Sequence, residues 1–159
     1  MRVLKILMSI LLTSMVMSFS ELPSGIFIIK KPGRKNPCEQ ELKMLIGGRK
    51  VCVLKKPIIH AEDIEYVTDI LYDPILKRNH VNVGLSASSV RTLNRTVSSI
   101  TKPEFAIVVN DNVIGIFMIN ERLTENFLRV GTDLDLKDLE AVKDALSGII
   151  REKPRKVNR

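Results

Sequence analysis

The stretch Phe105–Ile119 reads FAIVVNDNVIGIFMI and is the most apolar run in the chain after residue 20. The residues NDN at 110–112 interrupt this run with side chains that favour tight turns. The apolar segments on either side, Phe105–Val109 and Val113–Ile119, therefore predict two antiparallel strands joined by a short loop. The apolar side chains of such a hairpin must be buried against other elements, so the neighbouring segments indicate the class of fold.

Both sides of this hairpin carry the signals of an amphipathic helix. Ser86 is a suitable N-cap for the first helix, and Pro103 marks its end. Asp135 caps the second helix, and Asp138 follows at the third helical position. Apolar residues recur at intervals of three and four, namely Val90, Leu93, Val97 and Ile100 in the first helix and Leu139, Val142, Leu146 and Ile149 in the second.

Short apolar runs elsewhere predict further strands. They are Gly25–Lys31, Lys50–Lys55, His80–Leu85 and Phe127–Val130. Glu41–Ile46 is interpreted as a helical turn stopped by two glycines, and Ala61–Tyr72 fits either a helix or a strand. The order strand, helix, hairpin, strand, helix predicts an α+β domain, with a mostly antiparallel sheet and two helices packed on one of its faces.

The N-terminal segment has the layout of a secretory signal peptide. Two basic residues precede an apolar stretch over residues 6–17, and Ser20 supplies a small side chain just before a cleavage point at Glu21. The stretch has about a dozen residues and a membrane-spanning helix needs about 20, so cleavage is favoured over a retained anchor. We therefore expect a periplasmic or secreted protein with four parts. These are a signal peptide (1–20), an N-terminal extension with a strand and a disulfide loop (21–50), an α+β domain (51–150) and a basic flexible tail (151–159).

Positive charge is concentrated at the C-terminal end of the chain. The formal net charge is +7, and residues 151–159 alone hold five basic residues and one acidic residue. The sequence has no Trp and an aromatic content of 4%. Nucleic-acid-binding proteins instead present clustered basic surfaces with aromatic side chains for stacking. The pattern argues against a nucleic-acid partner and predicts that the tail can contact an anionic membrane surface.

The sequence contains two cysteines, Cys38 and Cys52. An isolated pair in an exported protein usually forms a disulfide, and closing a loop of about 15 residues adds roughly 3 kcal/mol by the chain-entropy estimate. The alternatives are two free thiols or half of a metal site. A zinc site needs about four ligands, and the only histidines are His60 and His80. The disulfide is the favoured interpretation.

The residues that could carry chemistry do not form a catalytic set. No serine lies in a G-x-S-x-G elbow, and neither histidine has a nucleophile nearby in the sequence. The acidic residues between Asp133 and Glu140 lack the order of a calcium-binding loop and are explained by helix capping. We therefore expect no enzyme activity, no catalytic residues, no cofactor and no metal.

Four segments of the chain occur in an order and spacing that resemble a known family. They are KKPIIHAEDI (Lys55–Ile64), VNVGLSASSVRTLNRTVSSI (Val81–Ile100), FAIVVNDNVIGIFMINERLT (Phe105–Thr124) and GTDLDLKDLEAVKDAL (Gly131–Leu146). Together they resemble the head part of the first periplasmic domain of SecD, the membrane subunit that assists protein export. The resemblance covers about Val51–Ile149. It implies a non-catalytic binding or accessory domain that contacts polypeptides and works beside the export machinery of the envelope.

The chain also departs from the family pattern. Asn112 stands where the hairpin of the family usually has Gly, Phe117 or a neighbour stands where it has Pro, and Glu125-Asn126 replaces a glycine-rich loop. SecD additionally has membrane-spanning helices that bear the carboxylate and the arginine of proton-driven export. This chain shows none of those segments, so the resemblance extends to the head domain alone.

Two classes of function follow from these observations. In the first, an unpaired strand edge accepts an extended client polypeptide through backbone hydrogen bonds. That edge is expected after the hairpin, at Ile119, Asn120, Leu123, Thr124 and Asn126. In the second, the protein is a secreted effector, an inhibitor or an envelope component that reuses the fold for an unrelated partner.

Overall fold

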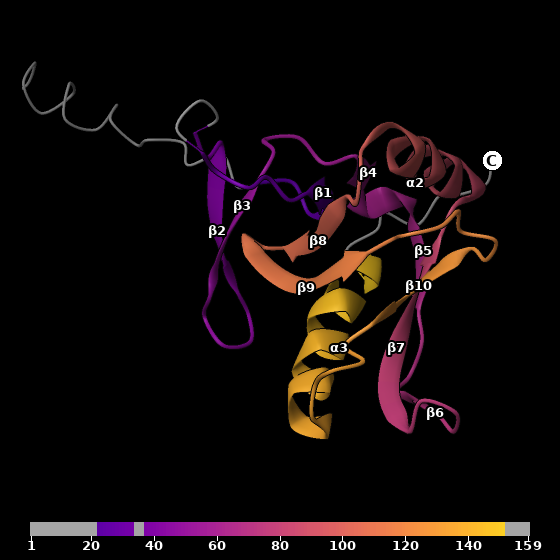
Figure 1. Cartoon of the computed structure of the whole chain (residues 1–159). Coiled ribbons are helices and arrows are strands. Elements are labelled where there is room, and N and C mark those ends of the chain that lie inside the picture. Colours follow the sequence, from indigo (N-terminus) through magenta and orange to yellow (C-terminus); the bar gives the residue numbers. More distant parts are fainter. Residues whose placement is uncertain (1–21, 34–36, 152–159) are drawn as a thin grey trace, which may run out of the picture.

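The computed structural model describes residues 22–33 and 37–151 and has an α+β fold (Figure 1). Its elements are β1 (Gly25–Ile28), β2 (Gln40–Met44), β3 (Lys50–Val53), β4 (Ile59–His60), the 3₁₀ turn η1 (Ala61–Asp63), β5 (Ile64–Val67), β6 (Leu71–Asp73), β7 (Arg78–Leu85), α2 (Ala87–Ser99), β8 (Glu104–Val109), β9 (Asn112–Met118), β10 (Phe127–Val130) and α3 (Leu136–Arg151). Signal cleavage between Ser20 and Glu21 and most of the basic tail lie outside the described residues. Within the described ranges, no helix is both long and apolar enough to span a bilayer.

The hairpin expected from the most apolar run is confirmed as β8 and β9. Asn110 and Asp111 form its two-residue turn with φ angles of 47° and 61°. Positive φ at both central residues is the type I′ geometry, whose twist matches that of the flanking strands, and Asn and Asp tolerate it well. The side chain of Asn112 donates from Nδ2 to the carbonyl oxygen of Asn110 at 2.8 Å, which further stabilises the turn.

The hairpin lies at the centre of a six-stranded sheet with the order β3-β2-β9-β8-β1-β4. The sheet curls until β3 meets the end of β1, through a bridge between Ile29 and Val53 and a hydrogen bond from Lys30 N to Cys52 O at 2.9 Å. Five strands thus enclose a small apolar interior. It is filled by Phe27, Leu42, Val51, Val53, Ala106, Val108 and Val113.

The interpretation of Glu41–Ile46 as a helical turn was wrong. These residues belong largely to β2, which pairs antiparallel with β3 and briefly parallel with β9. The pairing places Leu42 in the apolar interior, and that burial outweighs the local preference of a Glu- and Lys-containing segment for helix. The two glycines still end the element, since Gly47 and Gly48 have φ angles of 75° and 63° in the turn to β3.

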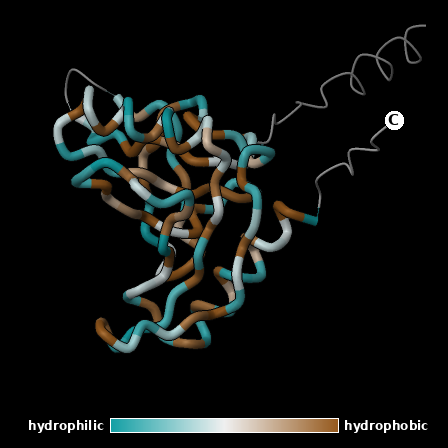
Figure 2. The backbone as a smooth tube through the Cα atoms, turned by 90° about the vertical axis from the view of Figure 1, so that its right-hand side faces the viewer, coloured by the Kyte–Doolittle hydropathy of each residue, from teal (hydrophilic) through white to brown (hydrophobic). Residues whose placement is uncertain are grey.

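The remaining strands form a second antiparallel sheet with the order β10-β7-β5, and β6 pairs with β7. The region Ala61–Tyr72, open to helix or strand from the sequence, therefore begins with the 3₁₀ turn η1 and continues in the short strands β5 and β6. The α+β class and the mostly antiparallel pairing are confirmed, and the strands are divided between two sheets. Figure 1 shows α3 below β8 and β9, with β7 beside it. Hydrophobic and hydrophilic residues alternate along much of the tube in Figure 2, as strands with one buried face require.

The largest core lies between the two sheets and the helices. The expected stripe of α3 is confirmed, because Leu139, Val142, Leu146 and Ile149 are all buried in this core. In α2, Leu93 is fully buried, Val90 and Val97 pack at the margin, and Ile100 is exposed beyond the helix end. Both predicted caps are confirmed: Ser89 N donates to Ser86 Oγ at 3.2 Å, and Asp138 N donates to Asp135 Oδ1 at 2.8 Å.

Candidate functional site

The outer edge of β9 is open over most of its length. Strand β2 pairs with β9 only at Asn112 and Val113, and Leu45 N closes this contact with a hydrogen bond of 2.8 Å to Val113 O. Beyond that point, within the residues that the structure describes, the stretch Ile114–Met118 has β8 as its single strand neighbour. Its outward backbone groups are therefore available for pairing with an extended chain.

A groove of about 610 Å³ runs along this open edge. Its apolar lining includes Met44 and Ile46 from the β2 end, Ile116 and Met118 from β9, and Leu134 from the loop before α3. Ile116 is 36% exposed and Met118 is 58% exposed, so the two side chains give the groove accessible apolar surface. The polar lining residues are Glu104, Asn120, Arg129, Thr132 and Asp133.

Two glycines set how closely the walls of the groove approach one another. A Cβ at Gly115 would lie 2.9 Å from Cγ1 of Val130, so a side chain there would push β9 away from β10. Gly131 has a φ angle of 80°, and a Cβ there would lie 2.3 Å from Cδ1 of Leu139. Without a side chain at Gly115, β9 lies close to β10, and without one at Gly131 the loop before α3 lies against the helix and bounds the groove.

The charges at the groove are held in ion pairs. Arg129 Nη1 lies 3.0 Å from Asp73 Oδ2, and Arg78 pairs with Asp133. Hydrogen bonds to its carboxylate, first that from the backbone N–H of Leu76, hold the pKa of Asp73 below its ordinary value. Because these four side chains neutralise one another in pairs, they add little net charge to the groove. The open edge of β9 therefore presents its backbone polar groups beside apolar side chains.

The segment expected to form the free edge, residues 119–126, is not a strand margin. It is the irregular connection between β9 and β10, and several of its residues are buried or already hydrogen-bonded within the protein. Ile119 is buried, and Leu123 is bonded on both backbone groups to the side chain of Asn94, its N–H to Oδ1 at 2.7 Å and its C=O to Nδ2 at 3.1 Å. The carbonyl oxygen of Asn126 accepts a hydrogen bond from Leu85 N at 2.7 Å.

Of the residues named for that edge, Asn120 lines the groove and Thr124 is exposed outside it. The open edge is the preceding strand itself, which sequence reasoning assigned to the core. Ile116 and Met118 alternate in the sequence and give one face of β9 large apolar side chains, but this pattern does not report that the outer edge of the strand is unpaired.

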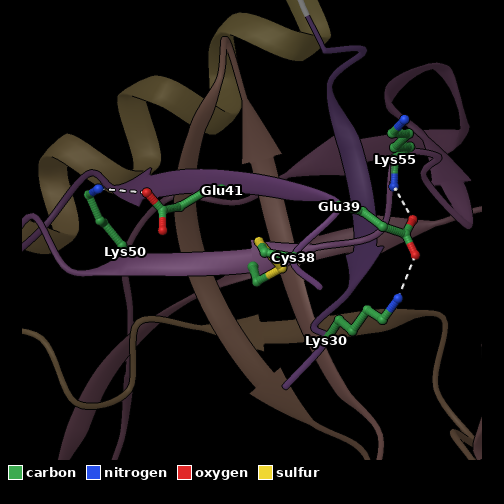
Figure 3. The surroundings of a disulfide bond; sticks show 7 residues. Lys30, Cys38, Glu39, Glu41, Lys50 and Lys55 are labelled. Atoms are coloured by element: carbon green, nitrogen blue, oxygen red, sulfur yellow. Dashed lines mark hydrogen bonds and ion pairs between the residues drawn. A yellow bond between two sulfur atoms is a disulfide. The ribbon is translucent and has the colours of Figure 1, made fainter. Parts of the chain in front are cut away.

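The disulfide between Cys38 and Cys52 is confirmed, with an S–S distance of 2.10 Å and a sequence separation of 14 (Figure 3). It joins the start of the β2–β3 hairpin to its end. Beside it, Lys30 Nζ lies 2.7 Å from Glu39 Oε1, and this hydrogen bond is the main cause that lowers the pKa of Glu39. Cysteine chemistry at a free thiol is therefore absent from the described part of the chain.

The histidines are separate from the groove. His80 is buried in β7 and His60 is exposed at the end of β4. In residues 22–33 and 37–151, no group of three or more His, Cys, Asp or Glu side chains is placed to hold a metal ion. The geometry of the candidate site is that of a binding surface built on a strand.

No family model and no curated protein matches the sequence. Solved structures do show the same fold. A crystal structure of SecDF in the Super-membrane-facing form matches 79% of this chain with a TM-score of 0.51 and 11% identity, and the match covers 19% of that chain. A second structure is of SecDF described as "a membrane component" that "enhances protein export". It also matches 79% of this chain, with a TM-score of 0.52 and 14% identity, over 63% of that chain. The chain thus spans less than two thirds of either SecDF structure, and its fold is that of a SecD-like domain.

Proposed function

We propose that this protein is an accessory module of protein export that binds extended polypeptides along the open edge of β9. The observation that carries the proposal is the five-residue stretch Ile114–Met118, unpaired by any described strand on its outer side and bordered by an apolar groove. The similarity of the fold to SecDF supports a role in protein export. The disulfide supports a location on the oxidising side of the cytoplasmic membrane.

Binding at this edge would be weak and tolerant of sequence. An edge of this length offers two or three outward hydrogen bonds, each adding about 0.5–1.5 kcal/mol net, and the side chains of the client would contact Ile116 and Met118. Because backbone groups are common to all polypeptides, such a surface discriminates little between clients. This property suits a protein that meets many unfolded chains in passing.

The test replaces the apolar edge by charge. The variant I116K/M118K places two lysines on β9, a device by which natural edge strands avoid pairing. Its binding to a fluorescent, permanently unfolded polypeptide is measured by anisotropy at equal ionic strength. We expect affinity to fall at least fivefold, with the melting temperature nearly unchanged because both side chains are partly exposed.

Two controls make the result specific. Leu76, which is 54% exposed on the β6–β7 turn and outside the groove, is changed to Lys together with Ile75, which is 88% exposed. This matched pair should leave binding unchanged, as should T124P in the loop after β9. Unaltered binding by a well-folded I116K/M118K would contradict strand pairing at β9 and would favour the second class of function, an unrelated secreted partner.

A further inference from the structure

A second surface of the molecule gathers three arginines. Arg91 and Arg95 from α2 and Arg122 from the β9–β10 loop line one depression of about 460 Å³, together with Asn94 and Ser98. Every one of these side chains carries a hydrogen-bond donor, and no carboxylate lines the depression. The β9 groove, in contrast, is lined by the carboxylates of Glu104 and Asp133.

The fold brings the arginines together through a specific contact. Arg91 and Arg95 are four residues apart, so they lie on the same face of α2, one turn from each other. The two hydrogen bonds between the Asn94 side chain and the backbone of Leu123 fasten the loop to this helix. Since Arg122 directly precedes Leu123, the same contact fixes where the third arginine lies.

The charges of these arginines are not balanced within the described part of the chain. Its ion pairs involve Lys30, Lys31, Lys50, Arg78, Arg129 and Lys143, and none involves an arginine of the depression. Helix α2 itself contains no acidic residue. Glu121 and Glu125 belong to the same loop as Arg122, but neither lines the depression.

Like charges one turn apart weaken a helix, and a third positive charge beside them adds further repulsion. The arrangement therefore costs stability and gives the fold no ion pair in return. An anion bound in the depression would attract all three arginines and so offset the repulsion between them. Guanidinium groups are suited to this because their planar forks donate two parallel hydrogen bonds to an oxyanion.

We propose that Arg91, Arg95 and Arg122 form a binding site for a phosphate-type oxyanion. The phosphate belongs either to a free ion or to the headgroup of an anionic phospholipid, and both present the same tetrahedral oxygens to the site. The site is separate from the β9 groove and does not depend on the polypeptide-binding function proposed above.

The test uses the full chain and two triple variants of equal charge change. R91Q/R95Q/R122Q removes the site, and R49Q/K56Q/K137Q removes three exposed cations that have no ion pair among the described residues. Inorganic phosphate is titrated at constant ionic strength while binding is followed by NMR chemical shifts of backbone amides. We expect saturable binding by the unmodified protein and the control variant, and at least a tenfold loss of affinity in the arginine variant.

A second arm distinguishes the sources of the phosphate. The proteins are floated with phosphatidylcholine vesicles with or without phosphatidylglycerol. Flotation that requires phosphatidylglycerol and the three arginines identifies a headgroup site, whereas saturable phosphate binding without flotation identifies a free-ion site. If the triple arginine variant does not fold, R122Q alone carries the test, because its residue lies in an exposed loop. Equal losses in the arginine and control variants, or no saturable binding in either arm, would overturn the proposal.

Discussion

The substitution Gly84→Ala tests how β5 is held against β7. Gly84 is buried in β7 opposite Tyr66 of β5. A Cβ at this position would lie 2.2 Å from Cε1, 2.3 Å from Cδ1 and 2.5 Å from Cζ of Tyr66, so the tyrosine ring covers the glycine. The added methyl group cannot be accommodated unless the ring moves by more than 1 Å, roughly the gap between these distances and normal contact.

The magnitude follows from the burial of the ring. Tyr66 is 38% exposed, so most of its surface is covered, and roughly 100 Å² of apolar contact is worth about 2.5 kcal/mol. Losing half to all of that contact costs about 1–2.5 kcal/mol, while replacing Gly by Ala in a strand returns about 0.5–1 kcal/mol. We therefore expect Gly84→Ala to lower the free energy of unfolding by up to about 2 kcal/mol.

The decisive measurement is a double-mutant cycle by chemical denaturation. In a Tyr66→Ala background the ring is gone, so Gly84→Ala should become neutral or stabilising, with a coupling energy of about 1–2.5 kcal/mol. Gly148→Ala in α3 is the matched control, because a Cβ there meets no atom within 4 Å and should not destabilise either background. If Gly84→Ala costs the same with and without the ring, to within about 0.5 kcal/mol, the steric reasoning is refuted.

Four other outcomes are expected. Asn94→Ala should cost about 1.5–3 kcal/mol in urea denaturation, because it leaves a partly buried N–H and C=O of the loop unpaired, and Asn94→Asp should restore only part of this loss. Replacing Cys38 and Cys52 by Ser should cost about 3 kcal/mol, and the same fall should follow reduction of the unmodified protein. A hydrogen bond from Lys143 on α3 lowers the pKa of Asp69, so the ionised carboxylate of Asp69 stabilises the fold at neutral pH. The contribution is lost as the pH falls from about 5 towards 2, and Asp69→Asn should flatten that part of the stability profile. Deleting residues 152–159 should leave the melting temperature unchanged and weaken attachment to anionic vesicles by about 1 kcal/mol for each basic residue near the surface.

The elements with strong local signals could be predicted from the sequence. Ser86 and Asp135 cap the two helices as expected, because an N-cap acts through hydrogen bonds within one turn of chain. The turn at Asn110 and Asp111 is equally local, since the φ angles it needs are tolerated by those two residue types. The disulfide followed from the presence of a single cysteine pair.

Contacts between distant segments could not be predicted in this way. Strand β2 was misassigned because its pairing with β3 and β9, not its own propensity, decides its conformation. The open edge of β9 was missed for a related reason. It exists because β2 ends its pairing at Met44, and no feature of residues 114–118 reports the length of another strand. The Arg122 depression likewise depends on the contact between Asn94 and Leu123, 29 residues apart.

The position of β1 constrains the order in which the chain can fold. The first strand pairs residue by residue with β8, as in Gly25 with Val108 and Ile28 with Phe105, and it also meets β3 through Ile29. A chain that emerges N-terminus first therefore exposes β1 while its main partner has not yet appeared. The β8–β9 hairpin, with its local turn, can form within microseconds once it is present, whereas docking of β1 must wait for it. Closure of the curled sheet between β1 and β3 is thus a late event, and until then the apolar residues of β1 remain exposed.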